Sequence, residues 1–202
     1  MLITFEGIDG SGKSTQISLL RDHLLEIGHE VQVFREPGGT DVSEIIRGML
    51  LNPELEIDPV TELLLFSSAR SQLVAEKVRP LLEKNVIVIL DRFYDSTTAY
   101  QGFGRKSMSI EQIKQINAAA THDLVPDFTF YLRLSLKEAR ERTKTFEKDR
   151  MERAGDTFFT QVFEGFEYLA KTESRFKTIN AKRNIESIHE EILKILSPSL
   201  KS

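Results

Sequence analysis

The 202-residue chain contains no cysteine. Disulfides, thiolate metal sites and a cysteine nucleophile are therefore excluded from its chemistry. The chain also lacks a run of about 18 apolar residues, so we expect no membrane-spanning helix and no membrane partner. Its first residues are apolar but lead directly into a glycine-rich segment, without the basic and apolar regions of a secretory signal. These absences favour a cytoplasmic protein.

An excess of positive charge is also missing. The chain has 27 basic and 31 acidic residues, which gives a formal net charge of −4. Broad nucleic-acid-binding surfaces are strongly basic, so we expect no nucleic-acid partner. Repeats and low-complexity linkers are absent too. Because the length suits one domain, we treat residues 1–202 as a single domain.

Short apolar runs alternate with longer segments of helical periodicity along the chain. The apolar runs predict five strands, at residues 2–5, 31–34, 86–90, 128–134 and 176–179. Apolar residues at three- and four-residue spacing predict helices over 13–27, 59–82, 109–121, 136–144, 157–172 and 185–196. In the second helix, Leu63, Leu64, Val74 and Val78 are expected on the apolar side. Alternating strands and helices predict an α/β fold, with a five-stranded parallel sheet flanked by helices on both faces.

A phosphate-binding pattern lies between the first predicted strand and the first predicted helix. Residues 7–14 read G-I-D-G-S-G-K-S, which fits G-x-x-x-x-G-K-[ST] in the required strand–loop–helix context. Its glycines let backbone N–H groups converge on phosphate oxygens, and the helix N-terminus adds a favourable dipole. A glycine-rich turn that binds nothing is the alternative. The residues expected to bind ATP are Gly7, Ile8, Asp9, Gly10, Ser11, Gly12, Lys13, Ser14 and Thr15.

Two of the expected active-site residues are candidate Mg²⁺ ligands. Ser14 is the hydroxyl position of the phosphate-binding pattern, which commonly binds this ion. Asp91 directly follows the third predicted strand, at the end where a carboxylate can orient Mg²⁺ or its water shell. An ordinary strand-end aspartate in a turn is the alternative for Asp91.

The phosphate-binding pattern alone does not separate a switch GTPase, a mechanical ATPase and a kinase. Switch GTPases of this size usually carry a base-reading N-K-x-D motif, which this sequence lacks. A small kinase of this class needs a second site for the acceptor. Candidate acceptor-site residues follow the second and third predicted strands and lie on the long helix between them.

Several further segments resemble bacterial thymidylate kinases, a family of P-loop nucleoside-monophosphate kinases. They are F-E-G-I-D-G-S-G-K-S-T at 5–15, R-E-P-G-G-T at 35–40, L-L-L-F-S-S-A-R at 63–70, D-R-F-Y-D-S-T-T-A-Y-Q-G at 91–102 and D-R-M-E at 149–152. The resemblance spans essentially the whole chain in the family's order. It implies a P-loop NTPase fold, a homodimer, and transfer of the γ-phosphoryl group of ATP to dTMP. A kinase for another nucleoside monophosphate and a P-loop ATPase without an acceptor remain as alternatives.

The resemblance also implies roles at the acceptor site. Phe66 would stack on thymine, and Arg70 would donate to a thymine carbonyl oxygen. Tyr100 would fill the space of a ribose 2′-hydroxyl. Apart from these three, the residues implied to bind substrate are Asp9 at the 3′-hydroxyl, Arg35 and Arg92 at the phosphate, Glu36 and Pro37 beside them, and Thr97 and Gln101 along the base. The alternatives are a core residue for Phe66, a solvated helix charge for Arg70 and a surface arginine for Arg92.

Residues 140–153 are dense in positive charge, which by itself fits a solvated helix face. The resemblance implies instead a lid that closes over the ATP phosphates. The loop between Asp9 and Lys13 has no arginine, so the lid would supply the catalytic cation, from Arg150 or, as second choice, Arg142. The other basic residues of this segment are Arg140, Lys144, Lys148 and Arg153. The residues expected to take part in catalysis are therefore Asp9, Lys13, Arg92, Arg142 and Arg150.

Overall fold

Five parallel strands form the sheet, as predicted. They are β1 (Leu2–Glu6), β2 (Val31–Arg35), β3 (Ile87–Asp91), β4 (Phe128–Arg133) and β5 (Phe176–Asn180), arranged in the order β2-β3-β1-β4-β5. The computed structural model describes residues 1–144 and 150–200. Lys148 of the predicted lid and Asp149 of the D-R-M-E segment therefore lie outside the described residues.

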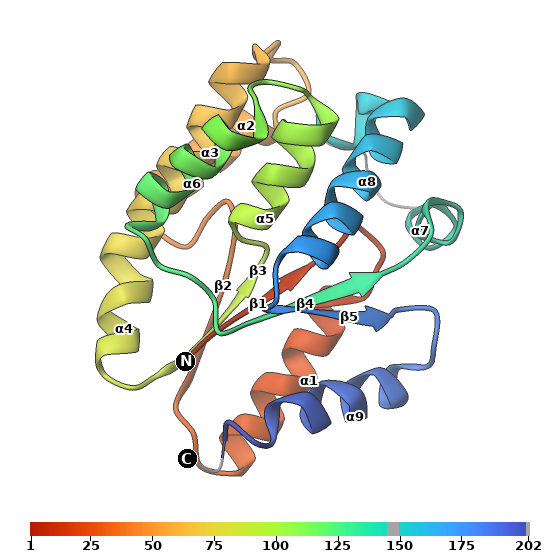
Figure 1. Ribbon diagram of the computed structural model, residues 1–202. Helices are drawn as coiled ribbons and strands as arrows, with labels where there is room; N and C mark the ends of the chain where they lie inside the picture. The colour runs from red at the N-terminus through yellow and green to blue at the C-terminus, as the bar shows by residue number, and fades with distance from the viewer. Residues whose placement is uncertain (145–149, 201–202) are drawn as a thin grey trace.

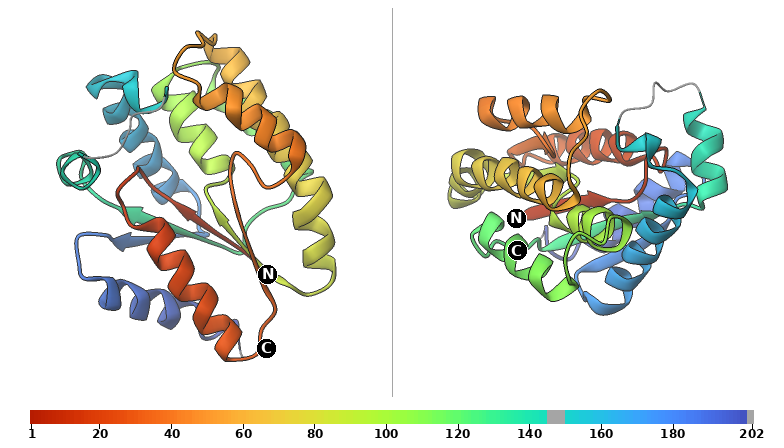
Figure 2. Two further views of the ribbon diagram at one scale, coloured as in Figure 1. Left: turned by 180° about the vertical axis from the view of Figure 1, so that it is seen from behind. Right: turned by 90° about the horizontal axis from the view of Figure 1, so that it is seen from above.

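Helices cover both faces of the sheet (Figure 1). On one face, α1 (Lys13–Glu26) packs beside α9 (Ile185–Leu196). On the other lie α5 (Tyr94–Thr97), its π-helical continuation η2 (Thr98–Gly104), and α8 (Asp156–Thr172). The remaining helical segments are α2 (Asp41–Leu51), α3 (Pro59–Leu73), the π-helix η1 (Val74–Val78), α4 (Arg79–Glu83), α6 (Ile110–Thr121), α7 (Leu136–Thr143) and the short 3₁₀ turn η3 (Glu152–Ala154). Figure 2 shows the same layers from behind and from above.

The central strands are buried, which explains their near-continuous apolar sequence. All of β1, and β3 as far as Leu90, is buried away from solvent. The parallel register places Phe5 beside Asp91, and Asp91 beside Arg35. The C-terminal ends of β1, β2 and β3 therefore meet at one edge of the sheet, which is where open α/β sheets bind their ligands.

The structure differs from the sequence prediction at two helical segments and one side chain. The α2 helix and the α5–η2 helix were not predicted; α2 begins where the Thr40 hydroxyl accepts a hydrogen bond from the Ser43 N–H. The predicted helix over 59–82 is continuous through a π-helical turn. Leu64 was predicted to lie on the buried apolar side of this helix, and that prediction was wrong, because its side chain is 49% exposed. Among the described residues, no helix is long and apolar enough to span a membrane.

Candidate active site

The predicted phosphate loop joins β1 to α1 and depends on glycine at two close contacts. Gly7 has a φ of +135°, and a Cβ there would lie 2.8 Å from the Leu132 carbonyl oxygen. Gly10 has a φ of +78°, and a Cβ there would lie 2.9 Å from the Thr143 methyl group. Side chains are strained at such angles and would also collide. The loop is thus packed between β4 and α7.

Lys13 points into this loop. Its Nζ donates hydrogen bonds to the carbonyl oxygens of Gly7, at 3.0 Å, and of Ile8, at 3.2 Å. The same nitrogen lies 3.7 Å from Asp9 Oδ1. Burial, and then the neighbouring Arg92 charge, lower the pKa of Lys13. The Lys13 ammonium group is therefore held inside the loop by two backbone carbonyl oxygens.

Arg92 and Asp9 form a close ion pair at the edge of the sheet. Arg92 Nη2 donates to Asp9 Oδ1 at 2.6 Å, and its guanidinium lies 5.2 Å from the centre of the Tyr100 ring. Although burial raises the pKa of Asp9, the charges of Arg92 and Lys13 lower it to about 2. Asp9 is thus an anion that joins the phosphate loop to the segment after β3.

Glu6, which the sequence analysis did not single out, fixes that segment. Its two carboxylate oxygens accept hydrogen bonds from the Phe93 N–H, at 2.7 Å, and from the Ser96 hydroxyl, at 2.6 Å. Ser96 Oγ in turn accepts a hydrogen bond from Arg92 Nη1 at 3.1 Å. Burial, and then the Asp95 charge, raise the pKa of Glu6 to about 8. The available signal was an acidic residue at the end of a buried apolar run.

The two candidate metal ligands come together. Ser14 Oγ donates to Asp91 Oδ2 at 3.2 Å, where α1 begins and β3 ends. Both are hard oxygen donors of the kind Mg²⁺ prefers. Within residues 1–144 and 150–200, no group of three histidine, cysteine or acidic side chains forms a metal cage. The pair fits a Mg²⁺ ion that takes its remaining ligands from water and nucleotide phosphates.

A cavity of about 150 Å³ opens beside the Asp9–Arg92 pair. Nine of the ten predicted substrate-binding residues line it: Asp9, Glu36, Pro37, Phe66, Arg70, Arg92, Thr97, Tyr100 and Gln101. Five lining residues were not predicted: Arg47, Leu51, Phe93, Ser96 and Met151. Phe66 lines the cavity and also packs against the hydrophobic core, and its predicted stacking on thymine stays a prediction. We refer to this space as the acceptor cavity.

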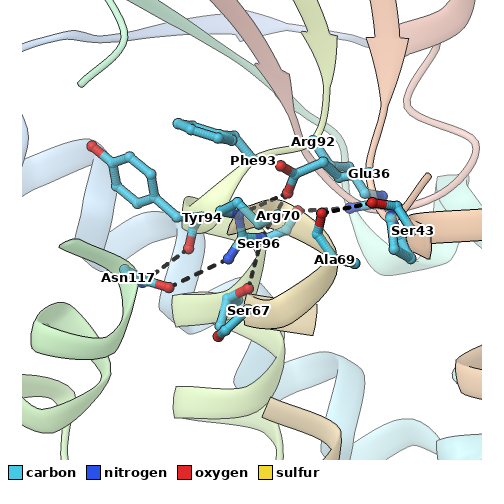
Figure 3. Close-up of polar contacts among 12 residues, drawn as sticks. Glu36, Ser43, Ser67, Ala69, Arg70, Arg92, Phe93, Tyr94, Ser96 and Asn117 are labelled. Atoms are coloured by element: carbon cyan, nitrogen blue, oxygen red, sulfur yellow. Dashed lines mark hydrogen bonds and ion pairs between the residues drawn. The ribbon is translucent and has the colours of Figure 1, made fainter. Parts of the chain in front are cut away.

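Arg70 is held inside the protein rather than solvated on the helix surface (Figure 3). It is 2% exposed. Its Nε donates to Glu36 Oε2 at 2.8 Å, and its Nη2 donates to the Thr97 hydroxyl at 3.0 Å. A longer contact of 3.5 Å joins Nη1 to the Asn117 side-chain oxygen. Burial raises the pKa of Glu36, and the Arg70 charge opposes that shift.

Arg35 lies outside the wall of the acceptor cavity. Its half-exposed guanidinium pairs with Glu44 of α2 at 3.0 Å. Arg47, also from α2, lines the cavity instead, and its Nη1 donates to the Pro37 carbonyl oxygen at 2.9 Å. Arg47 was missed because the helix that carries it was not predicted. The role of Arg35 at the acceptor phosphate stays a prediction.

The two candidate lid cations lie in different places. Arg142 reaches the phosphate loop, where its guanidinium donates to the carbonyl oxygens of Gly10 and Ala181, each at 3.1 Å. Arg150 instead donates through Nε to the Leu50 carbonyl oxygen at 2.8 Å and lies 2.6 Å from Glu62. This arrangement favours Arg142 over Arg150 as the cation nearest the phosphate loop.

Comparisons with known proteins identify the family of this chain. A family model described as thymidylate kinase matches residues 5–192. The thymidylate kinase of Chlorobium luteolum is 48% identical over 212 residues, covering 100% of this chain and 99% of the relative. That of Thermoanaerobacter sp. is 43% identical and covers 98% of each chain. The crystal structure of thymidylate kinase from Ehrlichia chaffeensis is similar at a TM-score of 0.81, with 37% identity and 98% coverage of both chains. The sequence and fold together establish that this chain belongs to the thymidylate kinase family.

Proposed function

We propose that the chain carries out the family's reaction, the transfer of the γ-phosphoryl group of ATP to dTMP, which gives ADP and dTDP for dTTP synthesis. One observation carries this proposal. The Asp9 carboxylate lies 2.6 Å from Arg92 and 3.7 Å from Lys13, so the phosphate loop and the acceptor cavity meet at one group. A donor phosphate on the loop and an acceptor phosphate on Arg92 would be neighbours.

On the acceptor side, the base and the sugar meet different walls of the cavity. Phe66 offers an aromatic face for thymine, a contact that is worth about 1–3 kcal/mol for a stacked base. Arg70 donates to a thymine carbonyl oxygen, and Thr97 and Gln101 lie along the base. Tyr100 fills the space that a ribose 2′-hydroxyl would need, which gives a preference for deoxyribose.

The acceptor phosphate binds to Arg92, with Arg47 as a second cation at the cavity wall. Guanidinium groups suit phosphate monoesters because they donate two parallel hydrogen bonds. Asp9 accepts the hydrogen bond of the 3′-hydroxyl. Because its pKa is lowered to about 2, Asp9 is charged over the whole neutral range. Glu36 holds Arg70 in place across the cavity.

On the donor side, residues 7–15 cradle the ATP phosphates, and Lys13 lies at the β- and γ-phosphates. Ser14 and Asp91 would hold Mg²⁺, which would neutralise charge on the phosphate oxygens. The acceptor oxygen is already anionic near neutral pH, so the reaction needs no general base. This chain supplies alignment and positive charge, from Lys13, Arg92 and a lid cation for which Arg142 is the stronger candidate.

A coupled assay of ADP release with a panel of nucleoside monophosphates tests the function. We expect rapid ADP release with dTMP and Mg²⁺, and little with AMP or dCMP. A different preferred monophosphate would make the chain a kinase for that nucleotide. ATP hydrolysis that no monophosphate changes would identify an ATPase without an acceptor. Omitting Mg²⁺ in the same assay tests whether the reaction needs the metal, and an Asp91→Asn variant with a raised Mg²⁺ requirement would support Asp91 as a residue that helps to hold it.

We also propose a homodimer in the cytoplasm. The support for a dimer is a set of exposed apolar side chains on α2 and α3, two helices that pack against each other. They are Val42, Ile45 and Met49 of α2 and Leu64 of α3. Exposed apolar groups that gather on adjacent elements are typical of protein interfaces. Light scattering would give the mass, and Ile45→Lys should shift it to that of a monomer.

A further inference from the structure

A buried carboxylate with no part in the proposed reaction lies behind the acceptor cavity. Glu62 is on α3, one helical turn before Phe66, and is completely buried. Burying a charge is costly unless it is paired and hydrogen-bonded. Glu62 does not line the acceptor cavity. Its partners therefore indicate what it does.

Three side chains converge on this carboxylate. Glu62 Oε1 accepts hydrogen bonds from Gln101 Nε2 at 2.9 Å and from Arg105 Nε at 3.3 Å. Glu62 Oε2 lies 2.6 Å from Arg150 Nη2. One negative charge thus faces two guanidinium groups and one amide. Removing it would leave two nearby positive charges without their common counter-charge, which is strongly unfavourable in a buried site.

Arg150 connects the same carboxylate to the segment that follows residue 149. Its Nε donates to the Leu50 carbonyl oxygen at 2.8 Å, and its backbone N–H reaches the Leu51 carbonyl oxygen at 3.5 Å. Arg150 therefore binds the C-terminal end of α2 and the first turns of α3 at once. The residue after it, Met151, is buried, and its sulfur lies 3.4 Å from Arg150 Nη2 and 3.9 Å from Arg105 Nη2.

Three lining residues of the acceptor cavity are direct neighbours of this network. Gln101 is bonded to Glu62, Met151 follows Arg150 in the chain, and Leu51 is bonded to Arg150 through its carbonyl oxygen. Each comes from a different part of the chain. Neither Glu62 nor Arg150 lines the cavity.

We propose that Glu62 and Arg150 are a positioning pair that sets the affinity for the acceptor nucleotide by holding Gln101, Met151 and Leu51 at the cavity wall. The pair touches neither nucleotide. This inference rests on the proposed function, in which the cavity binds dTMP. It gives Arg150 a different role from charge neutralisation at the transferred phosphoryl group.

Two substitutions separate these roles. Arg150→Met removes the guanidinium but keeps a long apolar side chain. Glu62→Gln keeps the shape of the side chain but replaces the carboxylate by an amide, whose N–H groups would face the donor groups of its partners. We expect each to raise KM and Kd for dTMP by about 10- to 100-fold, because lining groups displaced by even about 1 Å lose their contacts. At saturating dTMP, kcat should fall less than about threefold, and Kd for ATP should not change, because the pair is absent from the transition-state contacts.

The double variant and a rescue test whether the two residues act together. If they act as one unit, Glu62→Gln combined with Arg150→Met should lose no more dTMP affinity than the weaker-binding single variant. Arg150→Lys restores a charge beside Glu62 and should recover part of the affinity. Arg133→Met is the control, since it removes an ion pair of 2.7 Å to Glu167 that lies outside the cavity wall. It should leave the KM for dTMP unchanged.

Two results would overturn the inference. One is a turnover rate that falls at least about 100-fold in Arg150→Met while the KM for dTMP stays unchanged, which would place Arg150 at the reacting phosphoryl group. The other is wild-type kinetics in both single variants. If Glu62→Gln does not fold, Arg150→Met and Arg150→Lys decide the question alone. A wild-type protein inactive with dTMP would contradict the proposed function instead, so the two failures are distinguishable.

Discussion

The arrangement around Arg70 predicts strong discrimination between dTMP and dCMP. Arginine only donates hydrogen bonds. A thymine carbonyl oxygen accepts them, whereas cytosine carries a donating amino group at the same position. The guanidinium cannot turn away from cytosine, because Glu36 and Thr97 hold it at 2.8 and 3.0 Å and the side chain is 2% exposed. Two donors would therefore face each other in a dry site.

The size of the effect follows from that geometry. An unpaired buried donor costs about 1–3 kcal/mol and a charged one costs more. Sites built around a polar contact reject the wrong partner by about 10⁴-fold. We expect that ratio between the kcat/KM values for dTMP and dCMP. By contrast, dUMP lacks only a methyl group and should lose about 10- to 200-fold.

The variant for this test needs a compensating change. Arg70→Met alone leaves the buried Glu36 carboxylate without its partner, which costs about 3–5 kcal/mol. At about 2–4 °C per kcal/mol for a domain of this size, the Tm should fall by about 6–20 °C. Glu36→Gln in the same protein removes the stranded charge and should restore part of the Tm. The double variant should then lose most of the preference for dTMP over dCMP while remaining folded.

The assay is steady-state kinetics with dTMP, dUMP and dCMP on the wild type and on the double variant. The order of kcat/KM for the wild type should be dTMP, dUMP, dCMP. If the wild type phosphorylates dCMP as well as dTMP, the assignment of Arg70 as the base-reading residue is wrong. If the folded double variant keeps the full margin against dCMP, another residue must read the base.

Three further predictions concern the phosphate loop, the sugar and pH. Lys13→Ala should keep the fold and reduce kcat by at least about 10²- to 10³-fold, because it removes a cation beside the transferred group; near-normal turnover in the folded variant would rule out the loop assignment. The wild type should prefer dTMP to ribothymidine monophosphate because of Tyr100, so equal kcat/KM values would contradict that placement, and Tyr100→Phe should keep the preference. Burial, and then the Asp95 charge, raise the pKa of Glu6 from 4.5 to about 8. Between these pH values the folded protein keeps a proton on Glu6 that the unfolded chain releases. The free energy of unfolding therefore falls as the pH rises from 4.5 to about 8. The Tm of Glu6→Gln should fall less than that of the wild type between about pH 5 and 8, and identical slopes would argue against the raised pKa.

The sequence predicted the fold class, and its resemblance to the family predicted most residues that line the acceptor cavity. Strand and helix periods are local properties, and the five strands and the phosphate loop follow from them directly. The loop pattern also predicts phosphate binding locally, because glycine, lysine and serine act through backbone angles and short reaches within residues 7–14. Phe66 and Arg70 are four residues apart, so a helix places them on one face without reference to the rest of the chain.

Which charged side chains meet depends instead on how distant segments of the chain pack together. Arg142 and Arg150 are alike in sequence, yet one bonds to Gly10 and the other pairs with Glu62. Arg35 is the last residue of β2, and its guanidinium pairs with Glu44 instead of lining the acceptor cavity. A long flexible side chain can reach partners in many directions. Which partner it contacts depends on which helices and strands, distant in sequence, pack beside it. Such pairings depend on packing and burial, which no local pattern in the sequence encodes.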